Sequence, residues 1–401
     1  MPVMSASPVD VDEVHPRSRS AVIIGAGVGA LAAGIALRQA GWEVGIYERD
    51  AALRTKGGAL MLWPNATRAL SRLGVLDAVA AGASEIHTAQ IRHVQGPRFN
   101  RLPVRHLATK FGAPCLVVKR SHLLQVLADQ LPVNSLHFSR AAAEVDAKHA
   151  TAVFEDGSSV GGNVVIGADG VHSAVRRCLL NDGPPASVRQ WAFVGMSRRT
   201  DALVDLAAAG TTVGTVATGL RFWYAVLPDD WIYWYAVVSD KRRREEGLHD
   251  RADLSRLLAP WGQPTSALIE TAEEWTVVEI HHRTPIGSWH RGRVALLGDA
   301  AQPMSPDLGQ GAGMALEQAV VLGRVLAPRG RVDAALGRYS ARCIPRTASV
   351  ASASRIVAET SMPDDARLAS MRDRIWMGTP DSAAMLHLEM LIAPGCEAPG
   401  V

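Results

Sequence analysis

The sequence predicts an α/β fold (α+β by parts), with a Rossmann-like domain, an inserted, mostly antiparallel β-sheet domain, and C-terminal helices. Three observations favour it. A short β-branched run at residues 21–24 passes through a glycine-rich turn into an apolar helix. Two later apolar runs, at 163–167 and 292–298, also end in turns that contain Gly and Asp. Residues from about 185 to 284 instead alternate short strands with turns.

The first element is a complete βαβ unit. Residues 21–24 have the β-branched composition of a buried parallel strand. Residues 31–40 predict a helix that Gly41 ends, and residues 43–47 predict a second strand. Glycines inside residues 21–37 argue against a membrane span or a signal peptide, although the stretch is apolar throughout.

The turn of this unit reads Gly25-Ala26-Gly27-Val28-Gly29-Ala30. Gly25 allows a tight turn, Gly27 lets the backbone approach a pyrophosphate, and Ala30 is small enough for helix–strand packing. Free N–H groups and the helix dipole favour the pyrophosphate at this helix N-terminus. Glu48 ends the second strand, where it can accept hydrogen bonds from a ribose. The unit predicts dinucleotide binding, and the alternative is a glycine-rich turn in another α/β protein.

Composition excludes several classes of function. The 401 residues carry a net charge of +3, which is too small to favour nucleic acid or an anionic membrane as a partner. His281 and His282 are adjacent and point to opposite faces of a strand, so no metal site is expected. The four cysteines have neither metal nor redox-pair spacing and fit a reduced, cytoplasmic protein: they are Cys115, Cys178, Cys343 and Cys396.

The later motifs are Gly167-Ala168-Asp169-Gly170, Gly298-Asp299-Ala300-Ala301, and Pro306 followed by Leu308-Gly309-Gln310-Gly311-Ala312-Gly313. With these motifs in this order, residues 20–345 resemble the class A (single-component) flavoprotein monooxygenases, the family of p-hydroxybenzoate, salicylate and urate hydroxylases. The resemblance implies FAD as cofactor. It assigns FAD to Gly25, Gly27, Gly29, Ala30, Glu48, Arg49, Arg54, Gly58, Arg120, Asp169, Gly298, Asp299, Pro306, Gly309, Gly311, Ala312 and Gly313.

The resemblance also implies individual roles. Glu48 would hold the adenosine ribose with Arg49 along the adenine half, and Arg54 before Gly57-Gly58 would contact the flavin half or the pyrophosphate. Arg120 would reach FAD from a helix start; the alternative is a surface arginine. Asp299 would bind the ribityl chain. Asp169 lies in the motif tied to the handling of both FAD and NAD(P)H, and would act by fixing arginine side chains rather than by touching either ligand. At 306–313, N–H groups of a helix N-terminus would stabilise negative charge on reduced flavin, and Gly309, Gly311 and Gly313 would avoid crowding its ring.

Two positions depart from the family pattern. Gln302 stands where the family has His, and Gln318 stands where it has Asp. Gln302 can form hydrogen bonds but cannot become charged, so an oxidase, a dehydrogenase or a redox-neutral cyclase of the same fold remains an alternative. A binding module that keeps the fold without catalysis is a second alternative.

The inserted domain contains a predicted hairpin around Pro228-Asp229-Asp230. If Leu227 pairs with Trp231, one face carries Arg221, Trp223, Tyr233 and Tyr235, and the other carries Phe222, Tyr224, Ile232 and Trp234. By resemblance, the first face would roof the substrate cavity, with Arg221 and Tyr233 at substrate-contacting positions; the alternative is that these aromatics are core. The candidate catalytic residues are Arg221, Tyr233 and Gln302. The candidate pocket residues are Met61, Trp63, Arg221, Trp223, Tyr233, Tyr235 and Pro306.

The resemblance implies a reaction in which NADPH or NADH reduces FAD transiently and O2 forms a flavin C4a-hydroperoxide that hydroxylates or epoxidises the substrate. The apolar, aromatic pocket indicates a hydrophobic or aromatic small molecule, handled by a monomer or homodimer. The expected domains are a tail at 1–19, an FAD-binding domain at 20–90, 116–184 and 285–345, a substrate domain at 91–115 and 185–284, and a helical segment at 346–401.

Overall fold

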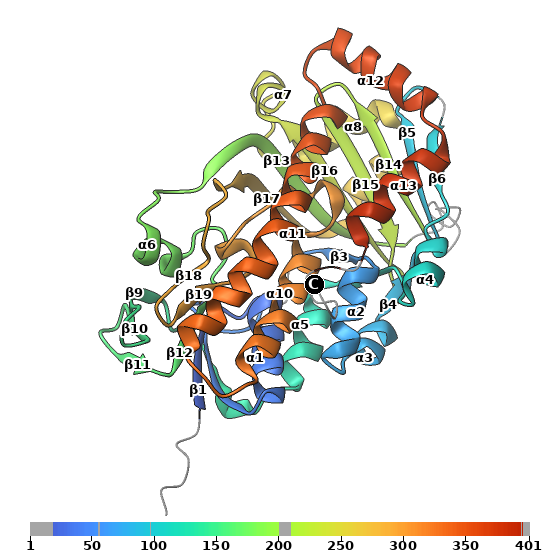
Figure 1. Cartoon of the computed structure of the whole chain (residues 1–401). Helices are drawn as coiled ribbons and strands as arrows, with labels where there is room; N and C mark the ends of the chain where they lie inside the picture. Colours follow the sequence, from blue (N-terminus) through green and yellow to red (C-terminus); the bar gives the residue numbers. More distant parts are fainter. Residues whose placement is uncertain (1–18, 55–56, 97, 200–209, 394, 396–401) are drawn as a thin grey trace, which may run out of the picture.

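The computed structural model describes residues 19–54, 57–96, 98–199, 210–393 and 395. It has the expected Rossmann-like domain, on which a large antiparallel sheet and the C-terminal helices are placed (Figure 1). Residues 1–18 of the predicted tail at 1–19 lie outside the described residues, and Arg19 belongs to the first strand. Among the described residues, no helix is both long and apolar enough to cross a membrane.

A six-stranded sheet forms the centre of the Rossmann-like domain. Its order is β18-β19-β12-β1-β2-β8, with parallel pairing from β19 to β8 and an antiparallel edge at β18. Strands β12 and β19 are fully buried and β1 is buried from Ala21 to Ile24, as their apolar residues require. The strands span Arg19–Ile24 (β1), Trp42–Tyr47 (β2), Leu136–His137 (β8), Val164–Gly167 (β12), His290–Arg291 (β18) and Val294–Leu296 (β19).

Three helices stack on one another beside this sheet. Helix α1 (Val28–Gln39) packs on α10 (Gly311–Leu326), which packs on the long helix α11 (Val332–Ser361). The α1–α10 contact is close because Gly323 faces Ala36, whose Cβ would lie 2.8 Å from a Cβ at position 323. A methyl group there would push the two helices apart.

Smaller elements complete this domain. Strands β3 (Ala59–Leu62), β7 (Leu116–Lys119) and β4 (Ala83–Glu85) form one antiparallel sheet, and β9 (Ala142–Asp146), β10 (Thr151–Phe154) and β11 (Ser159–Gly161) form another. The remaining helices are α2 (Pro64–Arg72), α3 (Leu76–Ala81), α4 (Arg105–Phe111), α5 (Arg120–Asp129), α6 (Ala174–Leu180) and the single turns η1 (Val133–Ser135), η4 (Gly298–Ala300) and η5 (Pro306–Leu308).

The second large sheet has seven strands in the order β17-β13-β16-β15-β14-β5-β6, with one parallel pair, β14 with β5. The predicted hairpin is confirmed, since Ala225 pairs with Tyr233, Trp223 with Tyr235 and Arg221 with Val237. The strands span Thr88–His93 (β5), Arg98–Leu102 (β6), Ala186–Arg198 (β13), Thr211–Ala217 (β14), Leu220–Val226 (β15), Trp231–Ser239 (β16) and Ala272–His282 (β17).

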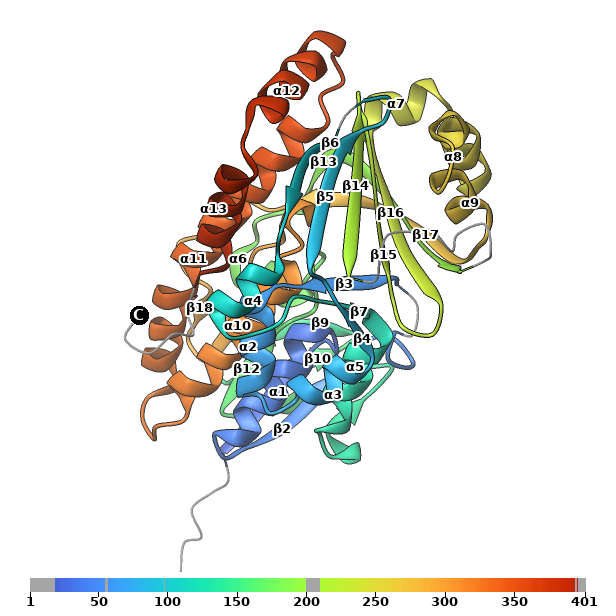
Figure 2. The same ribbon diagram turned by 90° about the vertical axis from the view of Figure 1, so that its right-hand side faces the viewer.

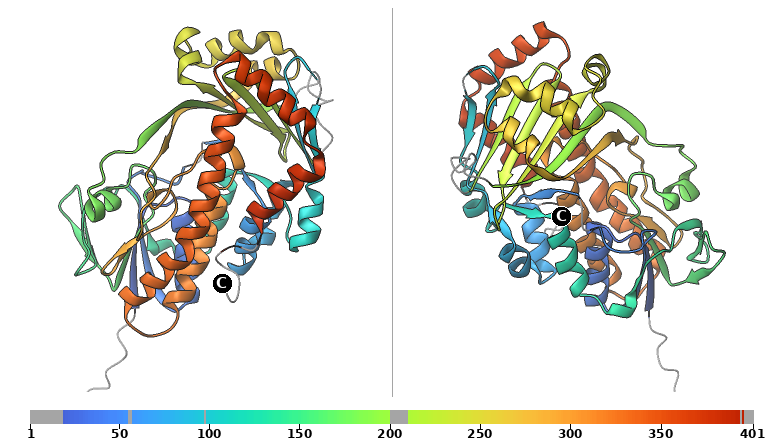
Figure 3. Two further views of the ribbon diagram at one scale, coloured as in Figure 1. Left: turned by 45° about the horizontal axis from the view of Figure 1, so that its top comes forward. Right: turned by 180° about the vertical axis from the view of Figure 1, so that it is seen from behind.

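The two faces of this sheet have different neighbours. Phe222, Tyr224, Ile232 and Trp234 form a core with helices α8 (Arg251–Leu258) and α9 (Thr265–Glu270), which lie over the outer face with α7 (Asp240–Glu245) and η3 (Ala259–Trp261) (Figure 3). The inner face points toward the Rossmann-like domain. Helices α12 (Ala366–Gly378) and α13 (Asp381–Ile392) contact edge strand β6 (Figure 2).

The expected domain boundaries need two corrections. A boundary at 90/91 would divide β5, which begins at Thr88 and pairs with β14 as part of the seven-stranded sheet. A boundary at 345/346 would divide α11, which continues through Pro345 to Ser361. The pairing of β5 with β14 joins distant segments, which a local pattern cannot reveal. Pro345 lies inside α11, although proline usually marks the end of a helix.

Candidate active site

A cavity of about 1330 Å³ lies between the Rossmann-like domain and the inner face of the seven-stranded sheet. It begins at the glycine-rich turn after β1, passes η4 and η5, and reaches β5 and β6. Pockets for a single drug-sized ligand hold about 300–1,000 Å³. This cavity is therefore large enough for a dinucleotide together with a second small molecule.

The glycine-rich turn shapes the first end of the cavity. Gly25 has φ +103°, and a Cβ there would lie 2.5 Å from the carbonyl oxygen of Ala168, so the turn requires glycine. A Cβ at position 27 would meet no atom within 4 Å, so the backbone of Gly27 is open to the cavity. Helix α1 begins immediately afterwards without a side-chain cap. Its first N–H groups are therefore available to an anion.

Acidic and basic groups flank this turn. The Glu48 carboxylate accepts hydrogen bonds from Ala26 N at 2.6 Å and from Asp50 N at 3.0 Å, so it lies against the turn. Arg49 and Arg54 line the cavity, and both side chains are more than half exposed. Arg54 Nε donates to Asp50 at 3.0 Å. These placements put the Glu48 carboxylate and two exposed guanidinium groups beside the glycine-rich turn.

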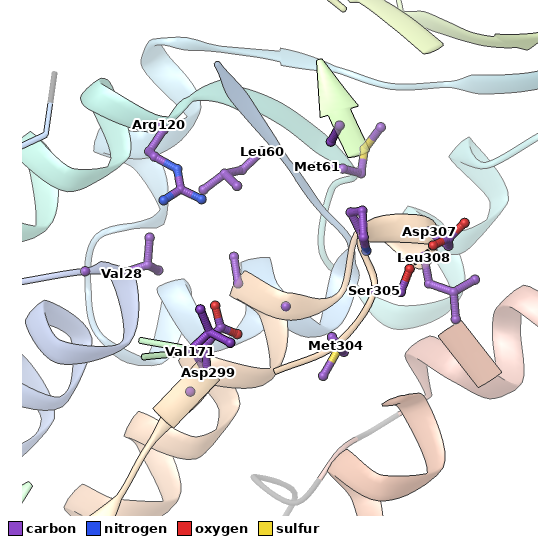
Figure 4. A pocket seen from close by; sticks show the side chains of 18 of the residues that line it. Val28, Leu60, Met61, Arg120, Val171, Asp299, Met304, Ser305, Asp307 and Leu308 are labelled. Carbon is purple, nitrogen blue, oxygen red and sulfur yellow. Dashed lines mark hydrogen bonds between the residues drawn. The ribbon is translucent and has the colours of Figure 1, made fainter. Parts of the chain in front are cut away.

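Arg120 and Asp299 line the middle of the cavity from opposite sides (Figure 4). Arg120 begins α5, and its buried Nε has no hydrogen-bond partner among the described residues. Asp299 belongs to η4 and is open to the cavity, but the surrounding protein desolvates it and raises its carboxyl pKa, while Arg120 opposes that shift. A guanidinium with an unpartnered Nε and a desolvated carboxyl that face one space indicate a polar ligand between them.

Asp169 caps a helix beside the same space. Its carboxylate accepts hydrogen bonds from Ser173 Oγ at 2.5 Å and Ala174 N at 2.7 Å, at the start of α6. Burial raises the pKa of Asp169, and these hydrogen bonds oppose the shift. The buried Arg176 anchors the other side of α6, because it donates to the carbonyl oxygen of Ala301 at 2.6 Å and pairs with Asp182. Asp169 lines the cavity, but its described hydrogen-bond partners belong to the start of α6 and include no arginine.

The loop from Ser305 to Gly311 is held from several directions. Trp63 Nε1 donates to the carbonyl oxygen of Leu308 at 2.9 Å, and Ser354 Oγ donates to that of Ser305 at 2.7 Å. Gln310 Oε1 accepts from Asn65 Nδ2 at 2.9 Å. The loop therefore presents the N-terminus of α10 to the cavity in a fixed orientation, and Gly311 has open space around its Cα.

Arg221 is almost fully buried at the cavity wall. It forms an ion pair with Asp307, whose side chain is also buried, and Nη1 donates to Ser361 Oγ at 2.8 Å. Its Nε and Nη2 have no partner among the described residues. Asp307 was not singled out from the sequence, because nothing in the local pattern places it against a strand more than eighty residues earlier. Arg221 thus offers two free donors while its charge is balanced.

Tyr233 and Tyr235 lie beside Arg221 on the inner face, with ring centroids 5.9 Å apart. Burial raises the pKa of both phenols above 10, against opposing effects of Arg120 on Tyr233 and Arg221 on Tyr235. Both are therefore neutral hydrogen-bond donors at physiological pH. Trp223 lies flat across Gly214, where a Cβ would meet its ring at 2.3 Å.

The structure brings most of the expected residues together around the cavity but not all of them. Ala30, Gly58, Gly313 and Gln302 do not line it. A Cβ at position 313 would lie 3.1 Å from Asn65 Nδ2, so Gly313 serves packing between α10 and α2 instead of the space beside the flavin ring. Gln302 follows η4, is buried and lies outside the cavity lining, and its expected catalytic role stays a prediction.

The residues present fit an FAD molecule. The open turn at Gly27 and the uncapped start of α1 fit its pyrophosphate, and Glu48 lies where a ribose would follow. Arg120 Nε and Asp299 provide the unpartnered donor and the desolvated carboxyl that a polar ribityl chain and flavin edge would satisfy. Beyond them, the start of α10 supplies N–H groups at the inner face of the sheet.

Comparison with known proteins agrees with this geometry. Residues 19–354 match the FAD binding domain family. The chain is 31% identical to aurachin C monooxygenase/isomerase from Stigmatella aurantiaca, over 88% of this chain and 92% of that protein. It is 32% identical to FAD-dependent urate hydroxylase from Klebsiella pneumoniae subsp. pneumoniae, over 80% of this chain and 85% of that one. The crystal structure of Klebsiella pneumoniae HpxO complexed with FAD and uric acid superposes with a TM-score of 0.85 at 29% identity, covering 94% of this chain and 97% of that chain. The chain therefore belongs to the FAD binding domain family, and within it to the FAD-dependent monooxygenases.

Proposed function

We propose that this enzyme hydroxylates or epoxidises a hydrophobic, aromatic small molecule, with NADPH or NADH as reductant and O2 as the oxygen source. The observation that carries the proposal is the continuity of one cavity from the glycine-rich turn to the inner face of the seven-stranded sheet. A cofactor and a substrate can therefore lie end to end in it. When bound, FAD would supply the redox chemistry, passing electrons from the nicotinamide to O2 and an oxygen atom to the substrate.

The chain's own residues would bind and orient the cofactor. The N–H groups of α1 would hold the pyrophosphate, Glu48 the ribose, and Asp299 the ribityl chain. Arg120 would place its free Nε on the same ligand. The start of α10, at Gly311 and Ala312, would direct backbone N–H groups at the flavin edge that gains negative charge on reduction.

The inner face of the sheet would orient the substrate. Arg221 would donate through Nε and Nη2, and Tyr233 and Tyr235 would donate as neutral phenols. Their raised pKa values keep both phenols protonated, so they would hold a substrate oxygen rather than remove its proton. Met61 and Trp63 would exclude water from the reacting atoms, which matters because water diverts reduced flavin and O2 to hydrogen peroxide.

The proposal is tested by NADH and NADPH oxidation with the FAD-loaded enzyme across a panel of phenols, indoles, quinolines and polyketides, with hydrogen peroxide measured in parallel. We expect at least one compound to stimulate oxidation many-fold while yielding less peroxide than reductant consumed. Stimulation in which peroxide accounts for all of the reductant, for every compound, would favour an oxidase. Gln302 stands where the family has His, which favours an oxidase. It lies outside the cavity lining, however, and so gives the oxidase alternative little support.

We infer a cytoplasmic location, because the proposed reductant is supplied there. NADH and NADPH are supplied in the cytoplasm, and Cys115 and Cys178 carry free thiols, as is typical of a reducing compartment. Burial also raises the pKa of the Cys115 thiol to about 12, which makes it unreactive.

A further inference from the structure

The cavity continues beyond the aromatic residues into a region that the proposed reaction does not use. We call this region the apolar arm. It lies between strands β5 and β6 on one side and helices α12 and α13 on the other (Figure 2). The residues that define it are Ala89, Ile91 and Leu102 from the strands and Trp376, Ala384 and Leu388 from the helices.

One face of the seven-stranded sheet lines both the candidate active site and the apolar arm. Strand register places Tyr233 beside Ala225, Ala225 beside Thr212, Thr212 beside Ala89, and Ala89 beside Leu102. All five line the cavity. Four steps between neighbouring strands cover roughly 19 Å, since strands lie about 4.8 Å apart. The arm therefore leads away from the reacting end by more than the width of one aromatic ring.

Two polar side chains on the strand side of the arm, Asn100 and Thr212, already have partners within the protein. Asn100 Nδ2 donates to the carbonyl oxygen of Thr379 at 3.1 Å and to Asp381 Oδ1 at 3.1 Å, which ties the α12–α13 junction to β6. Thr212 Oγ1 donates to the carbonyl oxygen of Tyr224 at 3.0 Å. By contrast, Arg221 keeps two free donors at the near end. The cavity therefore has a polar end and a long apolar end.

Small side chains leave room in the arm. Ala89 and Ala225 lie on the sheet side, and Ala383 and Ala384 lie on the helix side. Ile375 and His387 line the far opening and are exposed there. A flat ring with small substituents would fill the polar end and leave this surface unused.

We propose that the substrate of this enzyme carries a long aliphatic chain on its aromatic ring, and that the apolar arm binds this chain. This inference rests on the proposed function for the place of the ring, near Arg221 and Tyr235. Moving one methylene from water into apolar contact stabilises a complex by about 0.8 kcal/mol, which is about fourfold in the dissociation constant. Chain length should therefore control affinity steeply until the arm is full.

The test measures binding of 4-n-alkylphenols, from methyl to octyl, to the full-length FAD-loaded protein through the change in flavin absorbance. We expect the dissociation constant to fall about fourfold per added methylene over the first several members. Ala384→Phe, which fills the arm from α13, should reduce the octyl-to-methyl affinity ratio at least tenfold. Ile91→Trp should do the same from the opposite wall.

Ser382→Phe is the matched control, because Ser382 is exposed on the same helix and does not line the cavity. This variant should keep the octyl-to-methyl affinity ratio of the wild-type enzyme. FAD content and melting temperature are measured for each variant, and if one fails to fold, the other and the wild-type series decide. The proposal would be overturned if the dissociation constant of the wild-type enzyme did not change with chain length. It would also be overturned if the constant still fell as steeply in both filling variants.

Binding and turnover separate this inference from the proposed function. A steep alkyl series without oxygen transfer to any member would refute the monooxygenase reaction and leave the arm standing. Oxygen transfer to short phenols together with a flat series would refute the arm alone.

Discussion

The buried pair of Arg221 and Asp307 is the interaction whose loss should have the largest measurable effect. Asp307→Asn keeps the shape of the side chain and removes its charge. Arg221 would then be a buried cation without its carboxylate, with Ser361 as its remaining described partner. Removing one partner of a buried ion pair costs about 3–5 kcal/mol in the free energy of unfolding. We expect a loss in that range.

The assay is equilibrium urea unfolding of the FAD-loaded protein, followed by circular dichroism, with FAD content measured first. Asp333→Asn is the matched control, since it breaks an exposed pair with Arg331 and should leave the midpoint almost unchanged. The double variant Arg221→Met, Asp307→Leu should recover most of the loss, because it removes both buried charges. A loss below about 1 kcal/mol for Asp307→Asn would refute the view that this pair holds the loop to the sheet.

Four further results are expected. Gly25→Ala should abolish FAD retention, because its Cβ would strike Ala168 O, whereas Gly157→Ala, also at a positive φ (+81°) but in open space, should retain FAD in the purified protein. Asp169→Asn should lower the free energy of unfolding by about 1 kcal/mol through the weakened cap of α6, measured by urea titration. The free energy of unfolding should fall above about pH 10, where unfolded tyrosines ionise and the buried phenols stay neutral; Tyr235→Phe should reduce that fall in unfolding curves recorded from pH 9 to 11. Gln302→His should leave the KM of any substrate within about twofold, and a larger change in steady-state kinetics would mean that position 302 reaches the cavity.

Local sequence patterns were enough to predict the main elements. The β-branched run before Gly25 and the runs before the two later turns correctly indicated three strands, which the structure places side by side in one sheet. The hairpin register followed from its turn at 228–230, because a short turn fixes which residues pair. The inner and outer faces were then set by alternation along β15 and β16.

Contacts between distant segments could not be predicted in this way. The partner of Arg221 comes from a loop far along the chain, and the packing role of Gly313 depends on α2. Gln302 comes three residues after Asp299, which lines the cavity, yet Gln302 itself is buried outside the lining. The cover that α12 and α13 provide over β6 depends on Asn100 and Asp381, whose pairing has no local signal.

The most direct test of the central claim is the origin of the oxygen in the product. The FAD-loaded enzyme would be incubated with NADPH or NADH, the 4-n-alkylphenol that it binds most tightly, and 18O2, and the product analysed by mass spectrometry. We expect one 18O atom in each product molecule. A product oxidised without 18O, or one labelled only when H2 18O replaces the solvent, would contradict oxygen transfer from O2 and favour a dehydrogenase of the same fold.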